Sequence, residues 1–163
     1  MAKELTIEAA VENIGIVTAF VDEQLEALEC PLKAQMQIDI AIDELFGNIA
    51  QYAYHPETGD ATVRVEVAEH PMAVVISFID NGIPYDPLAK EDPDITLSAE
   101  ERAIGGLGIF MVKETMDSIS YEYKDGQNIL TIKKIYDNPA RPMEALALFF
   151  IANMYSRLCG YMI

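Results

Sequence analysis

Residues 73–79 form an almost unbroken run of apolar, strand-favouring side chains, and this run constrains the fold more than any other feature. It predicts a buried central strand, because a strand with one solvent-exposed face alternates apolar and polar residues. The run ends in Asp80-Asn81-Gly82, which places a carboxylate directly after the strand. A central strand needs a substantial core around it. A chain of 163 residues that is 51% hydrophobic can supply that core in one domain.

The apolar patterns on either side of this run predict an α/β domain. Alternation predicts strands over residues 5–9, 63–67, 119–123 and 129–135. Three- and four-residue spacing predicts helices over residues 11–28, 33–53 and 109–116. The Asp125-Gly126 dipeptide predicts a hairpin before the last strand. Residues 83–103 are rich in proline and acids without a sustained period, so they predict a long surface loop of the kind that is usually functional or mobile.

The charge and the scarcity of cysteine and histidine exclude several classes of protein. A net charge of −16 would repel a phosphate backbone, which disfavours nucleic acid as a partner. The charge fits a basic protein partner, or it only keeps the chain soluble. Two cysteines, Cys30 and Cys159, cannot form a disulfide scaffold, and His55 and His70 are too few for a zinc site. The N-terminus lacks a signal-peptide pattern, so we expect a cytoplasmic protein with reduced thiols.

The segment from residue 137 onward differs in composition from the rest of the chain. Residues 138–142 resemble a linker, and residues 143–163 are strongly apolar, with Glu144 and Arg157 as their only charges. The charge-free stretch is shorter than the about 20 residues that a bilayer span needs. A membrane-surface helix is disfavoured because basic residues are missing. We therefore expect a domain over residues 1–136, followed by an apolar helical tail over 137–163 that covers a hydrophobic surface of this domain or of a second copy.

Three groups of residues could carry chemistry. Glu44 and Asn48 are four residues apart, so they share one face of the second predicted helix. A carboxylate there can accept a proton from a hydroxyl or orient a water, and an amide oxygen suits magnesium. The same pair also fits an ordinary solvated helix flank. After the central strand, Asp80 can accept a hydrogen bond from an amine such as that of adenine, and Gly82 lets a flat ring approach; a plain strand-ending turn explains them equally.

The third group is Gly105-Gly106-Leu107-Gly108, which enters a predicted helix. Backbone amides at a helix start, without side chains in the way, form an anion site that suits a nucleotide triphosphate. No Gly-Lys-Ser/Thr occurs here, so this is not a P-loop. The alternative is a glycine hinge of a flexible lid.

Taken together and in this order, the three groups resemble the N-box, G1 box and G2 box of the GHKL ATPase superfamily. The sequence is most similar to the RsbW-like anti-sigma-factor serine kinases over roughly residues 3–134. The segments that carry the resemblance are residues 42–50, residues 80–84 and residues 106–112. The resemblance implies a Bergerat fold, which is an α/β two-layer sandwich whose mixed, largely antiparallel sheet is covered on one face by helices. A homodimer is a further expectation from the family.

The resemblance also implies a function and a role for each residue. It implies an ATP-dependent serine kinase that phosphorylates an anti-anti-sigma protein of the STAS type and binds a sigma factor. Glu44 would be the general base, Asn48 would hold Mg²⁺, and residues 83–105 would form a lid over ATP. The implied nucleotide-binding residues are Asn48, Asp80, Gly82, Ile83, Arg102, Gly105, Gly106, Leu107 and Gly108.

The sequence departs from the family pattern at two places that concern the site. Arg102 lies slightly upstream of the position where the family often carries an arginine for the γ-phosphate. Gln127 and Asn128 follow Gly126, where the family commonly has a threonine. The displaced arginine favours a rival function, an ATP-binding module that sequesters a partner without turnover. A third alternative is an ATPase that hydrolyses ATP in water without a protein acceptor.

Overall fold

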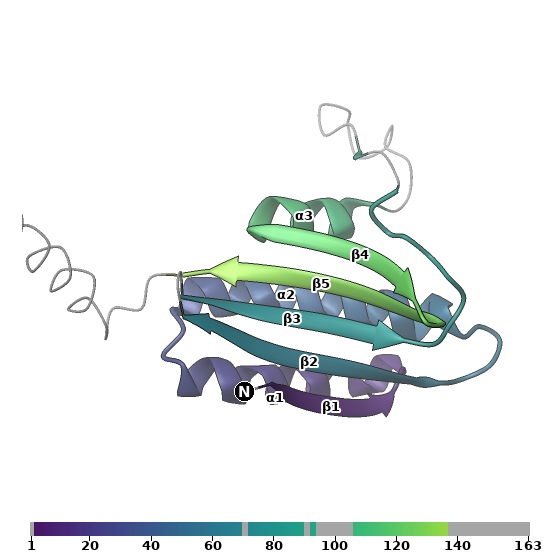
Figure 1. The fold of residues 1–163 in the computed structure, drawn as a ribbon, viewed down its shortest axis with the longest axis horizontal. Helices are drawn as coiled ribbons and strands as arrows, with labels where there is room; N and C mark the ends of the chain where they lie inside the picture. Colours follow the sequence, from purple (N-terminus) through teal and green to yellow (C-terminus); the bar gives the residue numbers. More distant parts are fainter. Residues whose placement is uncertain (1, 70–71, 90–91, 94–105, 137–163) are drawn as a thin grey trace, which may run out of the picture.

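The computed structural model describes residues 2–69, 72–89, 92–93 and 106–136 (Figure 1). The strands are β1 (Lys3–Glu8), β2 (Asp60–Glu69), β3 (Met72–Asp80), β4 (Ser118–Lys124) and β5 (Gln127–Ile135). The helices are α1 (Ile14–Ala27), α2 (Leu32–Asn48) and α3 (Leu107–Thr115), with a 3-10 turn η1 (Val11–Asn13) before α1 and a π-helical turn η2 (Ile49–Ala53) after α2.

The described strands form one five-stranded sheet in the order β1-β2-β3-β5-β4. The expected central strand is confirmed, because β3 pairs with β2 on one side and with β5 on the other. Every pairing among these strands is antiparallel, so the largely antiparallel sheet that the resemblance implies is confirmed, without a parallel pair among the described strands. In this register Asp80, at the end of β3, lies opposite Asn128 at the start of β5.

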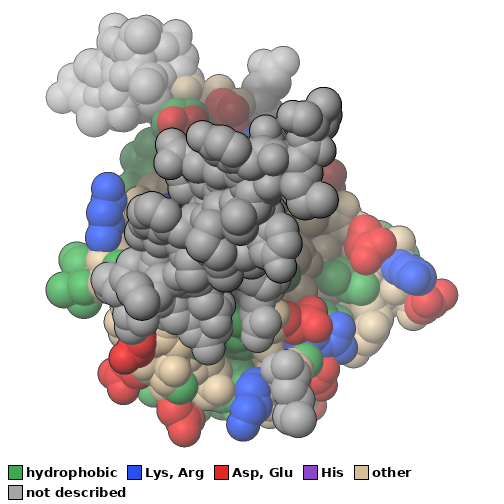
Figure 2. Space-filling view, turned by 60° about the vertical axis from the view of Figure 1, so that its left-hand side comes forward, with side chains coloured by type: hydrophobic (Ala, Val, Ile, Leu, Met, Phe, Trp, Pro, Cys, Tyr) green, Lys and Arg blue, Asp and Glu red, His purple; other side chains and the backbone are tan. Residues whose placement is uncertain are grey.

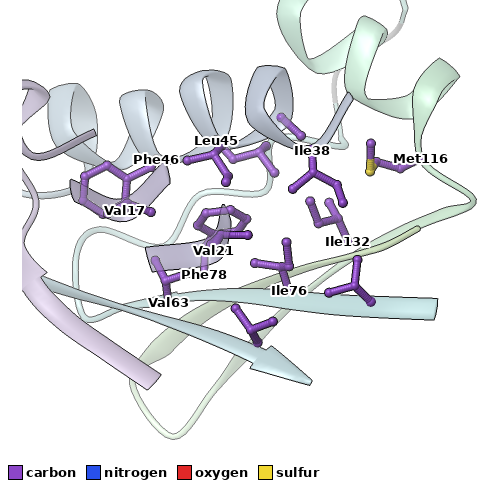
Figure 3. Packing of buried hydrophobic residues seen from close by; sticks show 14 of the residues in the cluster. Val17, Val21, Ile38, Leu45, Phe46, Val63, Ile76, Phe78, Met116 and Ile132 are labelled. Carbon is purple, nitrogen blue, oxygen red and sulfur yellow. The ribbon is translucent and has the colours of Figure 1, made fainter. Parts of the chain in front are cut away.

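The helices cover one face of the sheet, so the expected two-layer α/β sandwich is confirmed (Figure 1). Fully buried side chains from α1, α2 and the central strands meet between the two layers. Figure 3 shows the contributions of helices and sheet pointing toward one another, among them Val17, Val21, Ile38, Leu45, Phe46, Val63, Ile76, Phe78, Met116 and Ile132. Burial of such apolar side chains is the main contribution to the stability of the fold.

Two apolar residues within the helices predicted over 11–28 and 33–53 do not reach the core. Val11 is 49% exposed because it belongs to the 3-10 turn η1, which precedes the regular α1 helix. Tyr52 is 63% exposed because it lies in the π-helical turn η2. A π-helical turn has a wider hydrogen-bonding period than an α-helix, so it rotates the following side chains off the stripe. The expected helix over 33–53 therefore ends as α-helix at Asn48.

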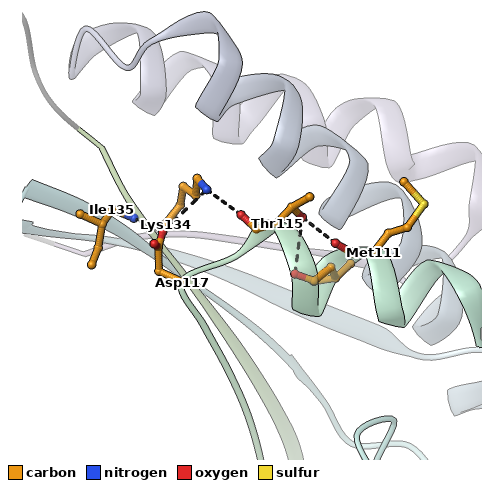
Figure 4. Close-up of polar contacts among 6 residues, drawn as sticks. Met111, Thr115, Asp117, Lys134 and Ile135 are labelled. Atoms are coloured by element: carbon orange, nitrogen blue, oxygen red, sulfur yellow. Dashed lines mark hydrogen bonds and ion pairs between the residues drawn. The ribbon is translucent and has the colours of Figure 1, made fainter. Parts of the chain in front are cut away.

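A lysine of β5 fixes the C-terminal end of α3 (Figure 4). Lys134 Nζ donates a hydrogen bond of 2.6 Å to the carbonyl oxygen of Thr115, the last residue of α3. The same ammonium lies 3.8 Å from Asp117 Oδ2, which accepts a hydrogen bond from the backbone N–H of Ile135. A cation at a helix C-terminus also interacts favourably with the helix dipole. These contacts hold α3 in place at the end away from its glycines.

The last features of the fold are its surface charges, the lengths of its helices and the segments that the structure does not describe. In the view of Figure 2, the visible acidic side chains are scattered, and the fewer basic ones stand apart from one another. In the part of the chain that the structure describes, no helix is long and apolar enough to cross a membrane. Most of the predicted loop over 83–103 and the whole tail over 137–163 lie outside the described residues.

Candidate functional site

Glu44 and Asn48 lie on the flank of α2 that faces α3, and both are half-buried. Asn48 Nδ2 donates a hydrogen bond of 2.9 Å to Glu44 Oε1. This bond follows from their four-residue spacing, which stacks the two side chains on one face of the helix. It orients the carboxylate, and among the described residues it leaves the amide oxygen of Asn48 available to accept from or bind another group. The two residues therefore act as a positioned pair rather than as separate surface side chains.

Gly108, in the first turn of α3, lies directly against the carboxylate of Glu44. A Cβ at this position would overlap Glu44 Oε1, Oε2 and Cδ, so any other residue would displace the Glu44 carboxylate from where it lies. Gly106, just before α3, has φ +91°, a backbone conformation that favours glycine. The N-terminal end of α3, where the first backbone amides have no partner within the helix, is thereby held beside the Glu44–Asn48 pair. Leu107 between the two glycines is 45% exposed.

Asp80 is only 4% exposed, and its carboxylate is held by two hydrogen bonds. The backbone N–H of Gly82 and Nδ2 of Asn128 each donate to Asp80 Oδ1 at 2.8 Å. Both of the bonds that Asp80 accepts from described residues end on Oδ1, which leaves Oδ2 as an acceptor for a ligand amine. A buried carboxylate with one oxygen committed and one available is suited to recognise a single donor.

The turn after β3 is anchored to the end of the α2–η2 helix. The backbone N–H of Ile83 donates to the carbonyl oxygen of Ala53 at 2.8 Å. A Cβ on Gly82 would collide with that carbonyl group and with the Ala53 side chain, so glycine permits this close approach. Because Ala53 continues the helix that carries Glu44 and Asn48, this contact joins the Asp80 turn to the helical pair.

The structure therefore brings the predicted residues of all three motifs to one end of the molecule. Glu44 and Asn48 meet Gly108 directly, and Gly82 and Ile83 dock on the extension of the same helix. Two predicted nucleotide-binding residues, Arg102 and Gly105, lie outside the described residues. The roles of all these residues remain predictions.

Asn128 is the residue whose importance the sequence does not reveal. Besides its bond to Asp80, Asn128 Oδ1 accepts hydrogen bonds from the Tyr121 hydroxyl at 2.7 Å and from the Tyr85 backbone N–H at 3.2 Å. Its Nδ2 also lies 3.2 Å from the carbonyl oxygen of Ile83. In the sequence, Asn128 is notable only because the family commonly has a threonine after the hairpin glycine. Its role becomes visible in the strand register, which places it opposite Asp80.

Tyr54 is a second residue that sequence patterns do not single out. Its hydroxyl accepts from the backbone N–H of Asn81 at 2.8 Å and donates to the carbonyl oxygen of Asp60 at 2.6 Å. Burial raises the pKa of this hydroxyl, and the nearby carboxylates of Asp80 and Asp60 raise it further. Tyr54 thus fastens the turn after β3 to the start of β2.

A depression of about 450 Å³ lies beside Tyr54 and is lined by residues 53–57 and 81–83. It shares only Gly82 and Ile83 with the predicted nucleotide site.

A magnesium site in this family would rely on few protein ligands. Mg²⁺ that accompanies a nucleotide takes one or two protein oxygens and completes its coordination with phosphates and water. Among the described residues, no group of three or more His, Cys, Asp or Glu side chains could hold a metal alone. The amide oxygen of Asn48, with its nitrogen already engaged by Glu44, fits the role of a single hard ligand.

Comparison with known proteins identifies the family. Residues 7–134 match the histidine kinase-like ATPase domain family, and the chain belongs to that family. It is 26% identical over 136 residues to the serine-protein kinase RsbW of Bacillus mycoides, covering 81% of this chain and 84% of the relative.

Two other curated relatives and one solved structure point the same way. The chain is 27% identical over 100 residues to the serine/threonine-protein kinase BtrW of Bordetella bronchiseptica, covering 61% of this chain and 70% of the relative. It is 30% identical over 103 residues to RsbW of Listeria monocytogenes, covering 60% of this chain and 64% of that relative. The expected resemblance to RsbW-like kinases is confirmed.

The fold is also shared with a crystal structure of the RsbU and RsbW domains of a Mycobacterium tuberculosis protein. The TM-score is 0.58 at 16% identity, over 83% of this chain. The chain spans 32% of the length of that structure. At this identity the likeness concerns the fold alone.

Proposed function

We propose that this protein binds ATP and transfers the γ-phosphoryl group to a serine of a protein partner. The observation that carries the proposal is the contact between Gly108 and the Glu44 carboxylate. It brings a candidate base to the glycine-rich start of a helix, where backbone amides favour phosphate groups. The names of the relatives, which are serine-protein kinases, support the same reaction class.

Each group in the site would contribute one part of the reaction. Asp80 Oδ2 would accept the exocyclic amine of adenine, with Gly82 leaving room for the ring. The amides around Gly106 and Gly108 would hold the phosphates. Glu44 would take the proton of the serine hydroxyl while the serine oxygen bonds to the γ-phosphorus and ADP leaves. Phosphoryl transfer depends mainly on such positioning and on charge stabilisation.

Magnesium would be held by the amide oxygen of Asn48 and by the nucleotide phosphates. When bound, Mg²⁺ reduces the negative charge that builds up on the transferred group. Arg102, if it reaches the γ-phosphate, would add to that stabilisation.

The partners follow from the same family. We infer that the phosphorylated protein is an anti-anti-sigma protein of the STAS type and that a sigma factor is the second partner. A net charge of −16 fits association with basic surfaces, because opposite fields speed encounter.

Phosphoryl transfer to a STAS-type antagonist, measured with labelled ATP and Mg²⁺, tests the proposed reaction. Replacing Glu44 by Gln removes the base but keeps the size of the side chain and its hydrogen bond to Asn48. We expect transfer to fall about 100-fold or more, the usual contribution of a general base, while ATP affinity stays within a few-fold. Asp43→Asn is the matched control, since Asp43 precedes Glu44 on the same helix and is exposed.

Other outcomes separate the rival functions. If the wild type binds ATP but transfers no phosphoryl group to any antagonist, the protein is a regulatory ATP-binding module without kinase activity. Release of inorganic phosphate without a protein acceptor would define an ATPase. Transfer that persists unchanged in Glu44→Gln would exclude Glu44 as the base.

A further inference from the structure

The outer face of α2 carries a line of exposed apolar side chains. Leu32 is 70% exposed, Met36 56% and Ile40 48%. Four-residue spacing places them in one line along the helix. The same helix buries Ile38 and its neighbours against the sheet, so this line faces away from the core. An apolar line of this kind is a common mark of a binding surface.

Helix α3 extends the line sideways. Leu107 is 45% exposed and Met111 is 43% exposed. The two helices pack against each other and run in opposite directions (Figure 1). Gly108 abuts Glu44, so Met111, one turn later in α3, lies at the level of Ile40, one turn earlier in α2. Figure 4 shows Met111 extending from α3 toward α2. We call Leu32, Met36, Ile40, Leu107 and Met111 the α2–α3 stripe.

The described chain leaves the domain at the N-terminal end of this stripe. Tyr136 is 7% exposed and belongs to the core, and its backbone N–H donates to the carbonyl oxygen of Met72 at 3.2 Å. Burial raises the pKa of the Tyr136 hydroxyl, and the neighbouring Cys30 thiol contributes to the shift. Cys30 precedes Leu32, the first residue of α2, by only two positions. The segment after Tyr136 therefore starts beside the first residues of α2.

The segment that follows has the composition and the length to cover the stripe. Residues 143–163 carry one acidic and one basic side chain, Glu144 and Arg157, and are otherwise uncharged. The linker over 137–142 can span about 20 Å when extended. As a helix, the apolar segment would be about 30 Å long, more than twice the roughly 12 Å between Leu32 and Ile40 along α2.

We propose that residues 143–163 dock on the α2–α3 stripe of their own chain. Docking would bury two apolar surfaces that otherwise face water, and it would place the segment over the outer side of the helix that carries Glu44. Leu107 belongs both to the stripe and to the predicted nucleotide-binding residues, whereas Met36 and Ile40, the stripe positions changed in the tests below, belong to the stripe alone.

Hydrogen exchange of the full-length protein, followed by mass spectrometry, tests this docking. We expect amides within 143–163 to be protected in the wild type. Ile40→Glu places a charge in the stripe, so protection in 143–163 should fall by about tenfold or more while that of β3 and β5 is unchanged. Ile16→Glu is the matched control: Ile16 is the same residue type on α1 and is 51% exposed, against 48% for Ile40. It should leave the protection of 143–163 intact.

Cross-linking gives a second readout that does not depend on destabilising the surface. With Cys30 replaced by Ser, a short thiol cross-linker should join Met36→Cys to the native Cys159 within one chain, and should not join Ile16→Cys to it. Unprotected amides in 143–163 of the wild type would overturn the proposal. Equal effects of Ile40→Glu and Ile16→Glu, or cross-links formed only between two copies, would also overturn it.

Discussion

At the scale of single residues, the site depends on how Asp80 is held. A buried carboxylate is costly unless hydrogen bonds satisfy it, and the Gly82 N–H and Asn128 Nδ2 both donate to its Oδ1. Asn128 Oδ1 is engaged in turn by the Tyr121 hydroxyl, which fixes the orientation of the amide. We infer that Asn128 is a positioning residue. It keeps Oδ2 of Asp80 directed at the adenine ring and does not bind the nucleotide itself.

Asn128→Ala should therefore weaken ATP binding without unfolding the protein. Loss of a hydrogen bond to a charged group in this setting corresponds to about 2 kcal/mol, or a decrease in affinity of roughly 30-fold. Asn128→Asp should weaken binding more, because it places a second carboxylate opposite Asp80. Binding of a fluorescent adenine nucleotide measures both effects. Gln127→Ala, at the neighbouring half-buried position, is the control, because the Gln127 side chain donates to Asn81 Oδ1 and not to Asp80. An Asn128→Ala protein with normal affinity would refute the positioning role.

At the scale of elements, two acidic side chains, one on α1 and one on α2, lie close together and lower the stability of the fold at neutral pH. Asp22 and Asp39 face each other, and Asp39 Oδ1 is enclosed without a hydrogen-bond partner among the described residues. Gln35 Nε2 donates to Asp22 Oδ1 at 2.8 Å, which supports the charged form of Asp22. Burial, then the charge of Asp22 and a hydrogen bond to it, raises the pKa of Asp39 from 3.8 to about 6.

This raised pKa predicts how stability changes with pH. Since the folded-state pKa lies above the unfolded one, the protonated Asp39 stabilises the fold, and this contribution is lost as pH rises through about 6. Asp39→Asn should raise the free energy of unfolding at pH 8 by about 1 kcal/mol, less than the full shift implies because solvent screens a half-buried pair. Near pH 4 it should have little effect.

Urea unfolding of wild type and variant at both pH values checks this difference. Asp43→Asn, an exposed position on the same helix, should leave stability unchanged at either pH. An Asp39→Asn protein that is less stable than the wild type at pH 8 would contradict the argument.

The elements also show what the sequence can and cannot predict. The central strand β3, the hairpin at Asp125-Gly126 and the existence of each helix follow from local patterns, because alternation and helical spacing reflect which face is buried. The switch from α-helix to π-helical turn after Asn48, which turns Tyr52 outward, leaves no mark in apolar spacing. The contact between Asp80 and Asn128 depends on tertiary register, which is set by the whole sheet.

At the scale of the whole molecule, one helix organises the proposed site. The flank of α2 carries Glu44 and Asn48, its extension through η2 receives the turn after β3 at Ala53, and the start of α3 packs beside Glu44. The three motifs are far apart in the sequence, yet each contacts this helix. Motif order in the sequence predicts which residues take part. Only the fold shows that Gly82 is needed for the turn after β3 to approach the Ala53 carbonyl group, and that Gly108 leaves the space in which the Glu44 carboxylate lies.

The central claim is that Glu44, Asn48, Asp80 and the N-terminal end of α3 surround one purine nucleotide. Calorimetric titration of the full-length protein with Mg²⁺-ATP and Mg²⁺-GTP, repeated for Asp80→Asn, tests it most directly. We expect saturable binding of one ATP per chain, at least about tenfold weaker binding of GTP, and a loss of this preference in Asp80→Asn, because an amide can donate to the guanine oxygen where a carboxylate cannot. No measurable binding of ATP, or ATP affinity unchanged in Asp80→Asn, would contradict the claim.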